Sequence, residues 1–144
     1  MRWSGPFRVE DLLRARQNGG PLPPVTRRGI YLVSMREWRL EPGPDSRPLY
    51  LGGLTGKSRR FRTRVGDLLI DLLGFYDRDT GHSSGGQSLD AFCARTGTER
   101  HNLWVGWATG LKCGRCAEVD LYLRLRPSEN KNRPPRCDTH GHAA

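Results

Sequence analysis

The chain has 144 residues, enough for one globular domain that buries its own core without disulfide bonds. Lysine and arginine outnumber aspartate and glutamate by 24 to 15, and this excess favours an anionic partner, nucleic acid in particular, because arginine pairs with phosphate through two hydrogen bonds. No apolar run approaches the roughly 18 residues that span a bilayer, and Arg2, Arg8 and Asp11 interrupt any signal-peptide core. We therefore expect a cytoplasmic protein with no membrane segment.

The N-terminal residues predict a helix followed by an extended connector. Val9, Leu12 and Leu13 recur at helical spacing, which predicts a helix over residues 6–18. The prolines that follow keep the next residues extended, because proline pushes its predecessor out of the helical region. We therefore treat residues 1–28 as an N-terminal helix and a proline-rich connector.

Two short apolar runs, at residues 29–33 and 48–52, predict the strands of a β-hairpin joined by a long polar insert. Each strand carries one tyrosine, Tyr31 in the first and Tyr50 in the second, so pairing the strands brings two phenols together. A tyrosine in a sheet most often packs against the core with its hydroxyl bonded. Taken alone, either tyrosine has that interpretation.

A cluster of five cations follows the second strand. A charge run of this kind usually forms a solvated surface, and the alternative is a surface that meets phosphate. The members are Lys57, Arg59, Arg60, Arg62 and Arg64.

The middle of the chain predicts two helices separated by a polar loop. Leucines at helical spacing predict a helix over residues 65–74. The polar stretch 75–87, which contains His82, is long for a turn and indicates a functional loop. A second helix would be capped by Ser88 and would end at Gly97.

The next two apolar stretches differ in how clearly they can be assigned. Residues 103–107 alternate as a third strand. Leu121, Leu123 and Leu125 alternate in the same way, but Ala117, Leu121 and Leu125 also repeat every four residues as in a helix. Periodicity leaves both structures open for this segment.

The tripeptides Gly29-Ile30-Tyr31 and Tyr50-Leu51-Gly52 resemble the two signature motifs of the GIY-YIG endonuclease family, with leucine as the middle residue of the second. Family members carry an arginine ten residues after the second tyrosine, and Arg60 stands at that position. Four residues later the family often has histidine or tyrosine, whereas this chain has Arg64. Arg64 is not suited to act as a general base, because a guanidinium keeps its proton at neutral pH.

A further part of the resemblance lies towards the C-terminus. Several family members pair a glutamate with an asparagine twelve residues later, and Glu118 and Asn130 have that spacing. The match covers residues 29–132, which we treat as a GIY-YIG nuclease-like domain. It implies an α+β fold with a small three-stranded antiparallel sheet flanked by helices, and it implies that Glu118 lies on a helix.

The resemblance implies a metal-dependent endonuclease that hydrolyses phosphodiester bonds of DNA. Glu118 would hold Mg²⁺ or Mn²⁺, a hard cation that one carboxylate, substrate phosphate and water can bind together. Arg60 would grip the scissile phosphate. Tyr31 would orient or deprotonate the attacking water, and Tyr50 would bond a phosphate oxygen or the water. Asn130 would fix the backbone around the Glu118 helix.

Other basic residues would contact the nucleic acid outside the reacting phosphate. These are Lys57, Arg59, Arg62, Arg64 and His82. We expect substrate specificity to lie in the hairpin insert, residues 34–47, and in the loop at 75–87.

Three cysteines and a histidine have the spacing of a zinc site, in which two Cys-x-x-Cys or Cys-x-x-His pairs supply four ligands. The ligands would be Cys113, Cys116, Cys137 and either His140 or His142. Such a site would clamp the C-terminal tail, residues 133–144, back onto the Glu118 helix. The alternative is that the cysteines are small buried thiols beside a histidine-containing tail.

A second class of function is compatible with the same residues. It is a catalytically inactive, zinc-stabilised nucleic-acid-binding module with the same fold. The complete set of Tyr31, Tyr50, Arg60 and Glu118 favours the enzyme, because a binding module needs no such set.

Overall fold

The computed structural model describes residues 1–20, 22–24, 28–54, 61–74 and 83–140. The strands in these residues are β1 (Arg2–Arg8), β2 (Gly29–Ser34), β3 (Pro48–Leu54) and β4 (Trp104–Thr109). The α-helices are α1 (Val9–Asn18), α2 (Phe61–Leu72), α3 (Ser84–Thr96) and α4 (Gly114–Leu125). Two short 3-10 helices are η1 (Pro44–Ser46) and η2 (Arg100–Asn102). The predicted α+β class is therefore confirmed.

The four described strands form one antiparallel sheet in the order β1-β4-β2-β3. The prediction of a three-stranded sheet is wrong, because β1 forms a fourth strand beside β4. The prediction of a helix from residue 6 is wrong for the same reason, since α1 begins only at Val9. The sequence does not predict this strand, because the pair Gly5-Pro6 is unusual within a strand. Proline is tolerated there because β1 is an edge strand whose register shifts between Ser4 and Phe7.

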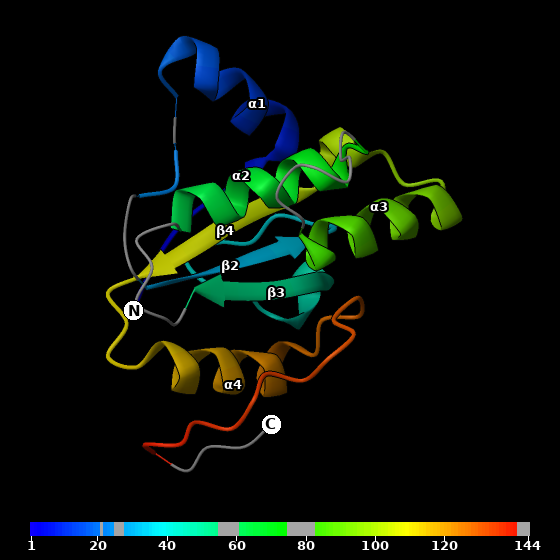
Figure 1. Ribbon diagram of the computed structural model, residues 1–144. Helices are drawn as coiled ribbons and strands as arrows, with labels where there is room; N and C mark the ends of the chain where they lie inside the picture. The colour runs from blue at the N-terminus through cyan, green and yellow to red at the C-terminus, as the bar shows by residue number, and fades with distance from the viewer. Residues whose placement is uncertain (21, 25–27, 55–60, 75–82, 141–144) are drawn as a thin grey trace.

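Helices cover both faces of the sheet, with α1, α2 and α3 on one side and α4 on the other (Figure 1). The α2 side is packed by residues such as Val33, Val105 and Leu68. The α4 side is packed by residues such as Ile30 and Leu121. Every residue of β2 is buried, as expected for a strand between two layers. No helix in the described part of the chain is long and apolar enough to cross a membrane.

The segment whose periodicity left strand and helix open is helical, as the family resemblance implied. In α4, Leu121 and Leu125 are buried against the sheet, whereas Leu123 is 44% exposed. The helix ends where Arg126 takes a positive φ of 46° before Pro127. Glu118 therefore lies in the middle of a helix that packs against β2 and β3.

The predicted helix at 65–74 is confirmed with an earlier start, at Phe61. The predicted cap at Ser88 is wrong, because α3 begins five residues earlier and its cap is Ser83, whose hydroxyl accepts from Gly86 N at 3.1 Å. Glycine disfavours helices in general. It is required here because a Cβ at Gly86 would lie 2.6 Å from the carbonyl oxygen of Leu68 on α2.

The chain after α4 returns to the free edge of β3 and bonds to it. Ser128 N donates to Pro48 O at 3.2 Å, and Glu129 N donates to Leu49 O at 2.7 Å. The Asn130 side chain then bonds Leu51 twice at 2.8 Å, accepting from its amide and donating to its carbonyl. This segment, residues 128–130, acts as a short cover for an edge that would otherwise leave backbone groups unpaired.

Replacing Asn130 tests how much this cover contributes to stability. We expect Asn130→Ala to lower the free energy of unfolding by about 1–3 kcal/mol, because two backbone groups of Leu51 lose their partner. Urea denaturation measures the change. The control is Asn132→Ala, since Asn132 is exposed and two residues away, and equal stability of the two variants would contradict the role of the cover.

Candidate functional site

The two signature tyrosines lie side by side on one face of the sheet. Tyr31 is paired with Gly52 across β2 and β3, which places Tyr50 at a diagonal position on the same face. Their rings are stacked with centroids 6.2 Å apart and an angle of 22° between planes. Tyr31 is 6% exposed, and Tyr50 is half-buried, so Tyr50 is the more accessible phenol.

The glycines of the tripeptides leave the space that these rings fill. A Cβ at Gly52 would overlap the phenol of Tyr31, and a Cβ at Gly29 would lie 2.8 Å from the Phe61 ring. Gly85, at the start of α3, does the same for Tyr50, whose ring would lie 2.5 Å from a Cβ there. The position of both phenols therefore depends on residues that carry no side chain.

Both tyrosines open into a small cleft of about 90 Å³ between the sheet, α2 and the start of α3. Its lining residues are Tyr31, Tyr50, Arg64, Asp67, Ser83, Ser84 and Gly85. Arg64 is exposed at this cleft and Asp67 is half-buried. The cleft thus combines two phenols with a cation, a carboxylate and two hydroxyls.

The cations predicted to contact phosphate have different positions. Arg64 lies at the tyrosine cleft, whereas Arg62 donates to Pro23 O at 2.6 Å and lines an apolar groove between α1 and α2. The other residues predicted for this role, or to grip the scissile phosphate, lie outside the described residues. These are Lys57, Arg59, Arg60 and His82.

Glu118 is a partly buried carboxylate whose pKa is influenced by two cations. Its side chain is 17% exposed, and its Oε2 lies 3.6 Å from the Arg115 guanidinium, one turn earlier on α4. Burial raises the pKa of Glu118, and the charges of Arg115 and Arg64 lower it only in part. The folded protein therefore disfavours the ionised form of the Glu118 carboxylate, compared with the same group in water.

The charge of Glu118 reaches the tyrosine cleft. Burial raises the pKa of Tyr31 far above its ordinary value; Tyr50 and Glu118 raise it further, and Arg64 lowers it. Burial also raises the pKa of Tyr50, against which a hydrogen bond with Ser84 acts. Both phenols therefore keep their protons at neutral pH and can donate a hydrogen bond to a ligand.

Asn130 lies beside this site and contacts the backbone of β3 rather than the cleft. Its amide side chain bonds both main-chain groups of Leu51, the residue after Tyr50. Glu129 adds an ion pair of 3.1 Å with Arg95 on α3. The segment 128–130 thus connects the strand that carries Tyr50 to a neighbouring helix.

Three residues at the cleft have a place that the sequence alone does not predict. The sequence assigns Arg64 to general nucleic-acid contact as a member of the cation cluster, and it predicts a helix that begins only after Arg64. It places Asp67 on that helix without a role and Ser84 in a loop. The earlier starts of α2 and α3 put Arg64 and Ser84 on helical turns, where they line the cleft together with Asp67.

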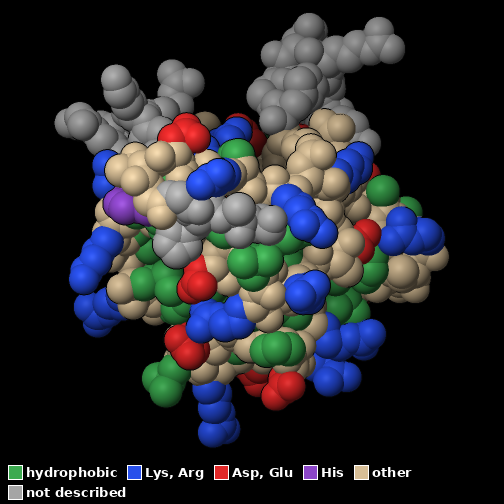
Figure 2. Space-filling model, turned by 90° about the horizontal axis from the view of Figure 1, so that it is seen from below, with side chains coloured by type: hydrophobic (Ala, Val, Ile, Leu, Met, Phe, Trp, Pro, Cys, Tyr) green, Lys and Arg blue, Asp and Glu red, His purple; other side chains and the backbone are tan. Residues whose placement is uncertain are grey.

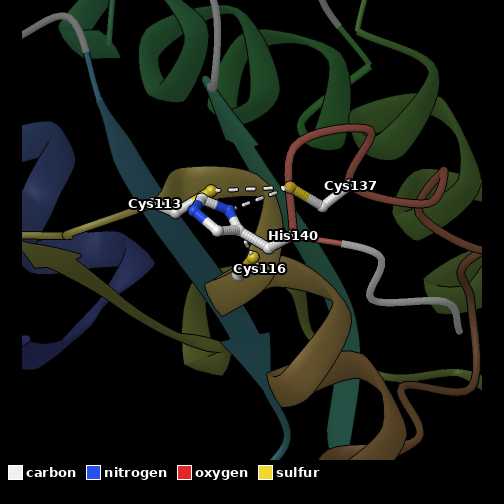
Figure 3. A group of neighbouring side chains, drawn as sticks. All are labelled: Cys113, Cys116, Cys137 and His140. Atoms are coloured by element: carbon white, nitrogen blue, oxygen red, sulfur yellow. Dashed lines mark hydrogen bonds between the residues drawn. The ribbon is translucent and has the colours of Figure 1, made fainter.

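A second cluster lies at the other end of α4, where Cys113, Cys116, Cys137 and His140 point toward one another (Figure 3). The first two come from the start of α4, and the last two come from the C-terminal tail. Their potential ligand atoms all lie within 4.8 Å of one another. His142 lies outside the described residues.

The spacing of these atoms fits a tetrahedral zinc ion. Zinc–sulfur bonds of about 2.3 Å and zinc–nitrogen bonds of about 2.0–2.1 Å place neighbouring ligand atoms about 3.5–3.8 Å apart. The Sγ atoms of Cys113 and Cys137 are 3.8 Å apart, and His140 Nδ1 lies 3.3 Å from the Sγ atoms of Cys116 and Cys137. The cluster can therefore hold a zinc ion with little rearrangement.

The start of α4 favours a thiolate at Cys113. Hydrogen bonds from the main chain and the side chain of Cys116 lower the pKa of Cys113 to about 6, whereas burial and the neighbouring thiols raise the pKa of Cys116 to about 12. Cys93, the other cysteine, is 1% exposed and belongs to the core with α2. Only three of the four cysteines are thus arranged for metal binding.

Comparison with protein-family models, with curated proteins and with solved structures found no match to this chain.

Zinc content tests the metal site directly. We expect the purified full chain to retain about one equivalent of zinc after washing with a mild chelator, and Cys137→Ser to retain less than about a tenth, because three ligands cannot replace a closed tetrahedral site. Elemental analysis provides the measurement.

Cys93→Ala is the matched control, because it removes a cysteine outside the cluster. It should retain the zinc of the wild type. A wild-type protein with less than about a tenth of an equivalent would count against a structural zinc site.

Proposed function

We propose that this protein is a metal-dependent endonuclease that hydrolyses phosphodiester bonds of DNA, with an active site of the GIY-YIG type. The observation that carries the proposal is the meeting of Tyr31, Tyr50 and Arg64 at one cleft, with Glu118 close enough to raise the pKa of both phenols. Phosphodiester hydrolysis needs such a set: donors for water and phosphate, a cation for the added negative charge, and an anchor for a divalent ion.

Arg64 is the described cation best positioned to bind the scissile phosphate. It is exposed at the cleft, and its charge lowers the pKa of Glu118 and of both phenols. A guanidinium stays protonated and can stabilise the negative charge that develops on phosphate. Arg60, which the family resemblance favours, is the alternative.

The two phenols have separate roles in this proposal. Tyr31 keeps its proton because burial raises its pKa, so it would orient the attacking water as a hydrogen-bond donor rather than deprotonate it. Tyr50 is more exposed than Tyr31, so it would donate to a phosphate oxygen at the mouth of the cleft.

Glu118 is the residue that would hold the divalent cation. Its burial leaves an ionised carboxylate that Arg115 and Arg64 stabilise only in part, which suits a group whose natural partner is a further cation. One carboxylate fits Mg²⁺ or Mn²⁺, because these hard ions keep water and share the substrate phosphate. When bound, such an ion supplies Lewis-acid stabilisation of the phosphate.

The charge of the molecule supports DNA as the substrate. The formal net charge is +9 at pH 7. Figure 2 views the molecule from the side of α4 and shows Lys and Arg side chains spread over that face, with fewer acidic side chains among them. A surface of this kind attracts the phosphate backbone regardless of sequence.

Plasmid nicking in the presence of Mg²⁺ tests the proposal. We expect the wild type to convert supercoiled plasmid to the open-circular form, and Glu118→Gln and Arg64→Gln to be slower by about 10²-fold or more, because each removes charge stabilisation at the reacting phosphate. Arg60→Gln, run beside them, decides which arginine binds that phosphate.

Unfolding would not explain the loss in Glu118→Gln. A folded-state pKa above the unfolded one means that the wild type loses stability as pH rises between the two values. The glutamine variant lacks this loss, so it should melt no lower than the wild type at neutral pH.

Arg124→Gln is the control for Arg64→Gln, since it removes the same charge from an exposed position on α4 that lines neither cleft. It should cleave as the wild type does. Equal cleavage by the wild type, Glu118→Gln and Arg64→Gln would indicate a contaminating nuclease and defeat the proposal. Tight DNA binding without cleavage would favour the inactive binding module.

A further inference from the structure

A basic cleft of about 600 Å³ surrounds the cysteine cluster at the start of α4. Four cations line it, namely Arg28, Lys112, Arg115 and Arg136, against one carboxylate, Asp138. Lys112 and Arg136 are exposed. The cleft shares no lining residue with the tyrosine cleft, so it is a separate feature of the surface.

The cations of this cleft differ in their surroundings. Lys112 and Arg136 are exposed at the cleft, whereas Arg115 already lies 3.6 Å from the carboxylate of Glu118. Cations in a hollow with low-dielectric walls produce a stronger field than cations on an open surface.

Arg115 connects this cleft to the candidate active site. It lines the cleft and also lies 3.6 Å from Glu118, which is three residues, or about 4.5 Å, further along the axis of α4. The cleft and Glu118 are therefore neighbours towards the start of α4.

The cysteine cluster places Arg136 near Lys112. Arg136 precedes Cys137 on the tail, whereas Lys112 precedes Cys113 at the start of α4. The two segments meet where Cys113 Sγ and Cys137 Sγ lie 3.8 Å apart (Figure 3). A zinc ion that holds these sulfurs together would thus hold Lys112 and Arg136 on one surface.

We propose that this cleft binds the sugar-phosphate backbone of duplex DNA next to the cleavage site, with Lys112 and Arg136 bonding phosphates. The proposal rests on the proposed nuclease function for its substrate. Lys112 and Arg136 are not among the residues proposed to act in the reaction. They set the affinity for DNA and its register on the protein, and they take no part in the hydrolysis. Backbone interactions of this kind position a protein and carry no sequence information.

Binding measured without cleavage separates this proposal from the nuclease function. The probe is a fluorescein-labelled duplex of random sequence, titrated by anisotropy with zinc-loaded full-length protein carrying Glu118→Gln, at several salt concentrations. We expect the further change Lys112→Gln/Arg136→Gln to weaken binding about tenfold or more at low salt. The negative slope of log K against log salt should become shallower by about 1.8, or about 0.9 for each phosphate that no longer pairs with a cation.

Arg124→Gln is the matched control, because Arg124 is exposed at the other end of α4 and is not among the residues that line the cleft. It should leave affinity and salt slope nearly unchanged. A double variant with the affinity and slope of this control would overturn the proposal. Loss of zinc from the double variant would also overturn it, because the cations would then serve the cluster and not a ligand.

A failure of the nuclease proposal gives a different result. A wild type that never cleaves plasmid, with a salt slope that still depends on Lys112 and Arg136, would retain the cleft as a DNA-binding surface.

Cysteine replacement adds a second readout. Cys137→Ser should make the salt slope shallower by about 0.9, half the change in the double variant, because releasing the tail removes Arg136 and leaves Lys112 in place. Cys93→Ala should not change it.

Discussion

The phenol of Tyr31 can lie flat over β3 only because Gly52 has no side chain, and the rest of the candidate site depends on this close approach. The ring stacks with Tyr50 and contacts Phe61, which itself occupies the space left by Gly29. The alternate residues of the same tripeptides point the other way, and Ile30 and Leu51 pack against α4. Each residue of the two motifs therefore has a steric reason to be there, independent of any chemistry.

Helix α4 is held in place from three sides, which matters because it carries Glu118. Its buried leucines pack on β2 and β3. The chain that leaves it bonds the edge of β3 through residues 128–130. The cysteine cluster then ties the tail back to the start of the helix. Residues far from a reacting group can control its position in this way, because an active site tolerates little displacement.

The sequence is most informative where one local pattern decides the structure. Leucine spacing locates α2, the apolar runs locate β2 and β3, and cysteine spacing predicts a cluster that could hold a zinc ion, with His140 or His142 as its fourth member. The errors arise where a tertiary interaction overrides local preference: Gly5-Pro6 lies in an edge strand, and Gly85-Gly86 opens a helix because Tyr50 and α2 leave no room for side chains. The position of Arg64 at the cleft depends on the start of α2, and the ends of elements are poorly defined by periodicity.

Crystals soaked in Mn²⁺, with anomalous data collected at an energy below the zinc edge, test most directly whether Glu118 and the tyrosine cleft form one metal site. We expect a manganese peak at the Glu118 carboxylate, on the side that faces Tyr31 and Tyr50, and no such peak in crystals of Glu118→Gln soaked in the same way. Manganese bound only elsewhere, for example at Asp67 or at the cysteine cluster, would contradict a metal-dependent site built on Glu118.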